Sequence, residues 1–265
     1  MATDLHPSGS YRYVPGIDPY SGGVRAEPGH RIVHASLRRP LPWQDGLRVV
    51  DAHLVSQGAE AAALCSVELR CAKPHSFGGF DAFNDEYRSA LNDRGLLLDR
   101  SAESTALVPV SAAINPVART NVAPVVHPPN ATELHAFGYV GTDEWSDGSP
   151  SFVIAGAGDL RDQSDLAPAA IVRAGERWVE AGAERAAVVL DEMEARMASL
   201  DVTWSDATTV DVYCAEPIHP VLESVVLERL GPAARRGVHW YLAAPPIVGL
   251  TFEMDLRGGT EEIWL

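Results

Sequence analysis

Two arginines stand at matching places in the chain, and each could bind an anion. Arg119 and Arg236 each precede a Pro-Pro pair by nine positions. A guanidinium group is always charged, and its planar fork fits a carboxylate bidentately in a way that Lys cannot match. The alternative is an arginine that pairs with a neighbouring acid on its own strand. Residue type alone favours that alternative, so a ligand-binding role needs a second line of support.

The strongly acidic composition bears on which molecules the protein can bind, and on how it could bind an anion. Acidic residues outnumber basic ones 36 to 21, which gives a formal charge of -15. The field of such a protein repels phosphate backbones and anionic membrane surfaces. We therefore expect neither nucleic acid nor membrane as a partner, and an anionic small molecule would have to be captured locally by specific arginines.

The cysteines and histidines do not indicate a metal site. Cys65, Cys71 and Cys214 show neither C-x-x-C spacing nor a companion histidine cluster, so we interpret them as buried thiols. His127 and His135 likewise have no metal-like partners in the sequence. The N-terminal residues lack the pattern of an export signal, and no apolar run of 18 residues occurs. The sequence predicts a cytoplasmic protein with no metal and no cofactor.

The chain contains a similar plan twice, a feature to be sought before local structure is assigned. The segments 67–74 and 210–217 both alternate apolar and polar residues and end in Cys-Ala-x-Pro. The offset between the copies falls from 143 at this match to 117 at Arg119 and Arg236, so the first copy carries 26 extra residues. They include the segment 100–115, which we interpret as an irregular loop and a candidate lid.

Periodicity predicts similar elements in both copies. In the first copy we expect a helix over 43–57, a strand over 63–72, and an amphipathic helix with Phe80, Phe83, Tyr87 and Leu91 on one face. Two strands, 120–126 and 133–139, would close that copy as a hairpin across the Pro-Pro turn. In the second copy we expect strands at 151–155, 209–214, 238–243 and 250–256, with helices over 186–200 and 220–230. Such an order indicates an α+β fold with helices packed on one face of a mixed sheet.

Several short motifs resemble the Rid (YjgF-like) family. Pro19-Tyr20-Ser21 is similar to the family's opening turn, Gly79-Phe80-x-x-Phe83-Asn84-x-x-Tyr87 to its second helix, and Pro116-x-Ala118-Arg119-Thr120-x-Val122 to its Pro-Ala-Arg signature. The resemblance implies two tandem Rid-like (chorismate mutase-like) units, each a mixed β-sheet with two helices on one face. Residues 1–142 would form the domain with the pocket and an inserted loop near 92–115. Residues 150–265 would form a degenerate second domain.

The resemblance also assigns roles to residues of the first copy. Arg119 would grip the substrate carboxylate, Tyr20 would donate a hydrogen bond, and Glu133 would position or activate water. Glu133 lies 14 residues after Arg119, where the family usually has 15, and a slip of one residue turns a strand side chain to the opposite face. Asn121, two residues beyond Arg119 and on the same face, could supply a further polar contact. Arg236 is the corresponding substrate-binding candidate of the second copy.

The second copy departs further from the pattern. Fifteen residues after Arg236 stands Thr251 rather than an acid, with Glu253 on the same strand face, and the Pro-Tyr-Ser turn is missing. We therefore expect this copy to be structural, with the working pocket in the first copy.

The family resemblance implies an enzyme that hydrolyses a reactive enamine or imine bearing a carboxylate, and releases ammonia and an oxo acid. Holding the reactants in place can itself lower the barrier to such a reaction by several kcal/mol. The insert and the second copy suggest a substrate larger than aminoacrylate, such as a 2-aminomuconate-like dicarboxylate from aromatic catabolism. No cofactor is needed for this hydrolysis.

Two other functions remain compatible with the sequence. A chorismatase-like hydrolase would cleave an enolpyruvyl ether, also with carboxylates held by arginines. A non-catalytic oligomer that binds small acids would need no chemistry at all. The family resemblance implies a homo-oligomer, with a trimer favoured.

Overall fold

The computed structural model describes residues 2–15, 19–99, 113–143 and 148–265. Most of the segment 100–115, predicted to be a loop and a candidate lid, lies outside the described residues. Within the described residues the helices are α1 (Trp43–Ser56), α2 (Phe77–Asn92), α3 (Trp178–Ser199), and α4 (His219–Val221) and α5 (Glu228–Leu230), which a π-helical stretch joins over Leu222–Leu227. The strands are β1 (Asp4–Leu5), β2 (Tyr11–Tyr13), β3 (Gly23–Ala26), β4 (His30–Pro42), β5 (Leu64–Arg70), β6 (Ala118–Pro124), β7 (Glu133–Thr142), β8 (Phe152–Gly158), β9 (Thr209–Tyr213), β10 (His239–Tyr241), β11 (Ala243–Ala244), β12 (Glu253–Gly258) and β13 (Glu261–Trp264).

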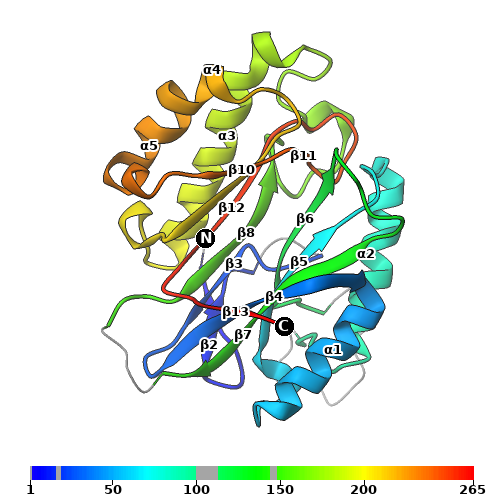
Figure 1. Cartoon of the computed structure of the whole chain (residues 1–265), viewed down its shortest axis with the longest axis vertical. Helices are drawn as coiled ribbons and strands as arrows, with labels where there is room; N and C mark the ends of the chain where they lie inside the picture. The colour runs from blue at the N-terminus through cyan, green and yellow to red at the C-terminus, as the bar shows by residue number, and fades with distance from the viewer. Residues whose placement is uncertain (1, 16–18, 100–112, 144–147) are drawn as a thin grey trace.

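The strands form two mixed sheets that lie between two layers of helices (Figure 1). One sheet has seven strands in the order β1-β2-β3-β8-β12-β9-β10, and the other has six in the order β11-β6-β5-β7-β4-β13. Helices α3 to α5 pack on the first sheet, and α1 and α2 on the second. A smaller core joins residues of β2, β3 and β8 to residues of β4, β5, β6 and β7 across the space between the sheets.

The helical faces expected from periodicity are the faces that the fold buries. In α1 the buried side chains include Leu47, Val50 and Leu54, which recur at intervals of three and four. In α2 they include Phe80, Phe83, Tyr87 and Leu91. Ser76 begins that helix, because its hydroxyl accepts a hydrogen bond from the Gly79 amide at 3.1 Å. Helix α2 is therefore fixed in place where its aromatic face meets β6.

The expected arrangement as two consecutive Rid-like units is wrong, because strands cross between the halves of the chain. The N-terminal strand β3 pairs with β8, where Gly23 lies opposite Ile154 and Arg25 opposite Phe152. In return β11 pairs with β6, and β13 runs parallel to β4. Neither sheet is built from one continuous half. A local pattern of alternation identifies a strand but carries no information about its partner. The division into domains at 1–142 and 150–265 stays a prediction.

The expected closing hairpins are also wrong. Strand β5 lies between β6 and β7, parallel to the first and antiparallel to the second. Strand β9 lies in the same way between β10 and β12. The Pro128-Pro129 segment therefore connects β6 and β7, which β5 separates in the sheet. Strands β10 and β12 are separated by β9, and the chain between them first forms β11 in the other sheet and then continues through Pro245-Pro246.

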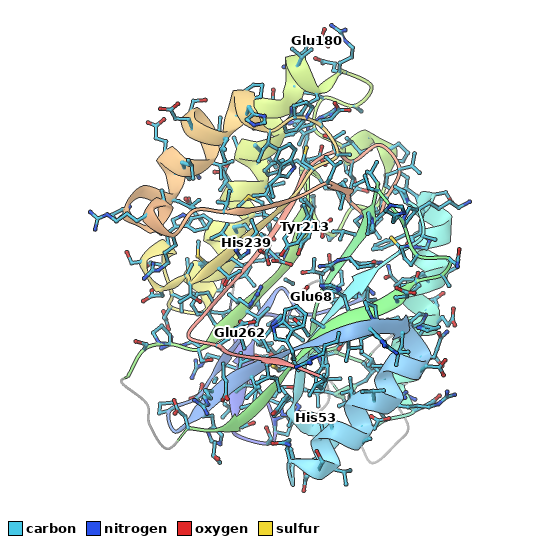
Figure 2. The ribbon with its side chains drawn as sticks, viewed as in Figure 1. His53, Glu68, Glu180, Tyr213, His239 and Glu262 are labelled. Carbon is cyan, nitrogen blue, oxygen red and sulfur yellow. The ribbon has the colours of Figure 1, made fainter. Side chains whose placement is uncertain are left out.

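Buried charges join the two sheets at the centre of the molecule, where Figure 2 shows Glu68 and Glu262 lying close to each other. His34 contacts both, with Nε2 2.8 Å from Glu68 and Nδ1 2.7 Å from Glu262. Arg257 lies 2.9 Å from Glu262 and 2.9 Å from Asp211. We call the group the inter-sheet cluster; its members are His34, Glu68, Arg70, Asp211, Arg257 and Glu262.

Among the described residues, no helix is long and apolar enough to cross a membrane.

Candidate active site

A small pocket lies beside β6, with a cavity volume of about 30 Å³, and we call it the Arg119 pocket. The chain around Ser21 runs parallel to β6 at Ala118, and β11 covers the other end of the strand at Ala123 and Pro124. The pocket lies along the same strand as these two contacts. Its lining combines a few polar groups with an apolar wall: Tyr20, Phe80, Arg119, Asn121, Gly156, Gly158, Leu160, Gln163, Leu166, Pro246, Ile247, Leu250 and Glu253.

Arg119 is a buried cation within a ring of aromatic side chains. Its side chain is only 2% exposed, and Nη2 donates a hydrogen bond to Asn84 Oδ1 at 2.8 Å. Four aromatic rings surround the guanidinium carbon, at 4.7 Å for Tyr20 and Tyr87 and at 5.5 Å for Phe80 and Phe83. Ring faces attract a cation, although less strongly than a carboxylate does. Burial lowers the pKa of Arg119, yet arginine stays charged in proteins.

Several polar atoms of the pocket have unused hydrogen-bonding capacity. Within the described ranges, Arg119 Nη1 is buried without a hydrogen-bond partner, as are both the amide nitrogen and the oxygen of Asn121. Asn121 is 3% exposed. Buried polar groups are nearly always paired in folded proteins, so such exceptions call for an explanation. A bound molecule with oxygen acceptors and a donor would satisfy all three atoms.

Glu253 brings an acid to the same pocket. It begins β12, lies opposite Gly158 of β8 and is 3% exposed. A Cβ at Gly156 would lie 2.3 Å from Glu253 Oε1, so this glycine leaves the space in which the carboxyl group lies. Burial raises the pKa of Glu253 well above its usual value, and nearby Asp255 raises it further, whereas Arg196 and Arg119 oppose the rise. The shift favours the protonated carboxylic acid, the form that can donate a proton.

Tyr20 lies between the polar groups of the pocket. It is partly buried, its ring covers the guanidinium of Arg119, and its hydroxyl donates a long hydrogen bond to the Gly156 carbonyl at 3.5 Å. Burial raises its pKa, so the phenol is protonated at neutral pH. Tyr20 therefore connects the Arg119 side of the pocket with β8.

The structure thus brings together three of the five residues selected from the sequence, Tyr20, Arg119 and Asn121. Glu133 begins β7 opposite Pro42 and Arg70, outside the set of residues that line the pocket. Arg236 is exposed, with a hydrogen bond of 3.4 Å to the Ser205 carbonyl.

Glu253 is the residue that sequence reasoning did not select. The sequence placed it on the strand face of Thr251 in the second copy, far along the chain from Arg119, and did not connect it with the Arg119 pocket. One signal was available: Gly156 and Gly158 stand two apart in a strand, and glycines within a strand mark a close approach by another group.

Metal binding has little support in the described part of the chain. No group of three His, Cys, Asp or Glu side chains is arranged there to hold a metal ion. The three cysteines are free and buried, and burial raises the pKa of the Cys71 and Cys214 thiols to about 12. Such thiols are poor nucleophiles and poor metal ligands at neutral pH.

Comparison with known families identifies the kind of protein that carries this pocket. The family model described as 2-aminomuconate deaminase CnbZ matches residues 3–263. The chain belongs to this family. A relative, the 2-amino-5-chloromuconate deaminase of Comamonas testosteroni, is 35% identical over 254 residues, which cover 96% of this chain and 95% of the relative. As a member of the CnbZ family, the chain is an enzyme that acts as a deaminase.

The fold has a counterpart among solved structures. The crystal structure of a chorismatase is similar with a TM-score of 0.50, and the match covers 92% of this chain and 79% of that one. Sequence identity is 12%, so the likeness concerns the fold alone. The chain has this fold, with two large mixed sheets, in place of the consecutive Rid-like units expected from the motifs.

Proposed function

We propose that the chain is a hydrolytic deaminase that acts on 2-aminomuconate or a close analogue and releases ammonia and an oxo acid. One observation carries the proposal on the structural side. A buried arginine with an unpaired Nη1, among the described residues, lines the same pocket as a buried acid whose pKa is raised by burial. The family and the curated relative both bear names of aminomuconate deaminases, which supports this substrate class.

Arg119 would bind the carboxylate next to the amine. Its Nη2 is already fixed by Asn84, and the aromatic rings hold the guanidinium plane. Nη1 is then available for a charge-assisted hydrogen bond, which is roughly twice as strong as a neutral one. The substrate is thereby fixed with its amine-bearing carbon inside the pocket, where orientation alone supplies part of the rate enhancement.

Glu253 would act as the acid and base. It donates its proton to a carbon conjugated with the amine, which turns the enamine into an iminium, and the carboxylate formed is favoured by the charges of Arg119 and Arg196. The carboxylate then takes a proton from the water that attacks the iminium carbon, giving a carbinolamine. General acid-base catalysis by a positioned side chain typically contributes 10²–10⁴-fold.

The remaining proton transfers complete the reaction. Glu253 protonates the amine nitrogen, the C–N bond breaks with its electron pair leaving on ammonia, and the hydroxyl of the carbon returns its proton to Glu253 as the carbonyl forms. The sum is enamine plus water to oxo acid plus ammonia, and Glu253 is protonated at the start and at the end. A buried acid with a raised pKa is suited to this cycle.

The other predicted residues take supporting roles in this proposal. Asn121 would bind a substrate oxygen or the attacking water with its unpaired amide, and Tyr20 would hold the guanidinium plane and donate a hydrogen bond. The role predicted for Glu133 passes to Glu253, because only Glu253 lines the pocket. The Rid relationship suggested by residues 116–122 stays a hypothesis.

The test is ammonia release from freshly generated 2-aminomuconate by the purified protein, with chorismate and pyruvate detection as the comparison. We expect ammonia in proportion to enzyme. Arg119→Met should lower kcat/KM by about 10²–10³-fold, as expected when a buried charge pair loses one partner. Thermal stability is measured alongside, because Met removes an unpaired buried donor and also the hydrogen bond to Asn84 and the contacts with the rings. Pyruvate from chorismate without ammonia from 2-aminomuconate would contradict the proposal.

We also propose that the chain forms a homo-oligomer, with a trimer as the working hypothesis. The support is a set of exposed apolar side chains on edge strands and their extensions, namely Trp240, Tyr241, Leu242 and Trp264. Mass measurement in solution tests the assembly.

A further inference from the structure

Asn115 joins the turn that carries Tyr20 to the strand that carries Arg119. It is 2% exposed, and its side chain makes hydrogen bonds in both directions. Nδ2 donates to the Pro19 carbonyl at 2.8 Å, and Oδ1 accepts from the Val117 amide at 3.0 Å. Val117 directly precedes β6, in which Arg119 is the second residue. One buried side chain therefore fixes the residue before Tyr20 relative to the start of the Arg119 strand.

The backbone beside Asn115 is itself held by helix α2. Arg88 of that helix is 5% exposed, and its Nη2 donates to the Ala113 carbonyl at 2.7 Å. Of the four aromatic rings described around Arg119, three lie on the same helix, and Tyr20 is the one that comes from a distant part of the chain. Asn115 therefore lies at the place where this distant ring is brought to the three rings of α2.

The turn around Tyr20 has further hydrogen bonds that do not involve Asn115. The Ser21 amide donates to the Val117 carbonyl at 3.0 Å, and the Ser21 hydroxyl donates to the Gly23 carbonyl at 2.8 Å. These bonds hold the chain on the side that follows Tyr20, whereas Asn115 holds the side that precedes it. Loss of the Asn115 side chain should therefore loosen the Tyr20 ring and leave the rest of the turn in place.

We propose that Asn115 is a positioning residue, which holds Tyr20 over the guanidinium of Arg119 and thereby orients the arginine that binds the substrate carboxylate. This inference rests on the proposed function and adds a residue that acts on the site from outside. Asn115 is not one of the residues that line the Arg119 pocket, so it acts through the residues that it holds. Small displacements of a group that orients the substrate are enough to weaken binding and slow the reaction.

Equilibrium binding of muconate, which has the carboxylates and lacks the amine, tests the inference without turnover. Asn115→Ser keeps a hydroxyl that can accept from the Val117 amide, as Asn and Ser both do in turns, but the side chain is too short to reach the Pro19 carbonyl as well. We expect muconate binding to weaken about tenfold, near the upper limit for one neutral hydrogen bond. In turnover of 2-aminomuconate, KM should rise by a similar factor and kcat should stay within about threefold of the wild type.

A double-mutant cycle shows whether Asn115 acts through Tyr20. In a Tyr20→Ala background, Asn115→Ser should weaken muconate binding by less than about twofold, because the ring that Asn115 holds is gone. Ser151→Ala is the matched control, since Ser151 is also buried and its hydroxyl accepts from the Ile32 amide at 2.8 Å. The control should lower Tm about as much as Asn115→Ser does and leave muconate binding unchanged.

The same loss of muconate binding from Asn115→Ser with and without Tyr20, or a similar loss in Ser151→Ala, would show a merely structural role and overturn the inference. Wild-type affinity in Asn115→Ser, or no muconate binding by the wild type, would also overturn it. If Asn115→Ser does not fold, Asn115→Asp keeps the size and the acceptor, loses the donor to Pro19 and should show the same loss. Ammonia release is measured separately, so muconate binding without ammonia would contradict the proposed function alone.

Discussion

The molecule contains two groups of buried charges that differ in how completely they are paired. In the inter-sheet cluster, His34 contacts an acid through each ring nitrogen, and Arg257 bridges Asp211 and Glu262. In the Arg119 pocket, the guanidinium of Arg119 has one hydrogen bond, and Nη1 has no partner among the residues described. Most members of both groups are buried, although the Glu262 side chain of the inter-sheet cluster is 46% exposed. The difference indicates that the first stabilises the fold, whereas the second is left incomplete for a ligand.

The same contrast appears in the pKa values of the acids. Burial would raise the pKa of Glu68, but its hydrogen bond to His34 and the charges of His34 and Arg70 bring it well below the usual value. Burial raises the pKa of Glu253, and its neighbours do not reverse the change. The hydrogen-bonded His34 favours the ionised form of Glu68, whereas burial favours the protonated form of Glu253, which can donate.

Glu253→Gln should give the largest effect on activity. The substitution keeps the shape and removes the transferable proton, so we expect kcat to fall by about 10³-fold, within the range for loss of a general acid. Stability at pH 7 should hold or rise. Because burial raises the pKa of Glu253 in the folded protein above its usual value of 4.5, the ionisable group costs stability as pH rises above 4.5, where the unfolded chain ionises it. Steady-state kinetics and thermal melting check both points. Unchanged kcat would remove Glu253 from the mechanism.

Glu68→Gln should destabilise the inter-sheet cluster and lower the stability of the fold. It leaves His34 and Arg70 buried beside a neutral amide, and removing one member of a buried ion pair typically costs about 3–5 kcal/mol. We expect Tm to fall on the order of 10 °C for a chain of this size. The activity of the molecules that remain folded should change less than threefold at a temperature below both transitions. A large loss of kcat without a loss of Tm would reverse the roles assigned to the two regions.

The pH dependence of stability should follow His34. Burial alone would lower its pKa, but hydrogen bonds to Glu262 and Glu68 raise it to about 9 from 6.5. A raised pKa means that the imidazolium stabilises the fold fully below pH 6.5 and that this stabilisation is lost as pH rises through 9. The lost free energy would be on the order of 3 kcal/mol. Denaturant titrations between pH 6 and pH 10 measure it.

His34→Gln is the control for that titration. The variant should be less stable at pH 6 and should show a flatter decline towards pH 10 than the wild type. The same decline in the variant and the wild type would assign it to other groups.

Arg236→Ala should have the smallest effect. Arg236 is exposed, and its 3.4 Å hydrogen bond to a carbonyl competes with water. We expect kcat/KM within twofold and a free energy of unfolding within about 0.5 kcal/mol of the wild type, as for most surface substitutions. This result would extend the comparison to exposed charges, because water can pair with an exposed arginine such as Arg236, whereas the buried Nη1 of Arg119 depends on a ligand for its hydrogen bond. A tenfold loss of activity would restore the sequence-based assignment of Arg236 to substrate binding.

The sequence predicted the parts of the site that lie close together in the chain. Arg119 and Asn121 are two residues apart on one strand, and Tyr20 follows a recognisable turn, so type and spacing identified all three. Glu253 could not be found in this way. It reaches the pocket because β12 pairs with β8 and because Gly156 leaves room for its carboxyl group. Those are facts about strand partners, which a single sequence does not specify.

The fold shows the same limit. The helical faces of α1 and α2 were predicted from intervals of three and four residues, because a helix is stabilised by residues near in sequence. The sheets were predicted wrongly, because β3 pairs with β8 and β13 with β4 over more than a hundred residues. The Cys-Ala-x-Pro repeats correctly marked two strands, β5 and β9, and gave no information on the strands that cross between the halves.

The strand exchange also affects the order of events during synthesis on the ribosome. Strand β13, at residues 261–264, forms one edge of the sheet that holds α1 and α2. Strands β1 to β3 join the rest of the seven-stranded sheet through β8, so they can do so only after β8 has been made. Domains generally fold as units, N-terminal first, as the chain emerges. Here the first half cannot complete its sheet early, because the strand that pairs with β4, β13, is made almost last. The nascent protein therefore carries unpaired strand edges for most of its translation, and chaperones that cover such edges should increase the yield of active enzyme.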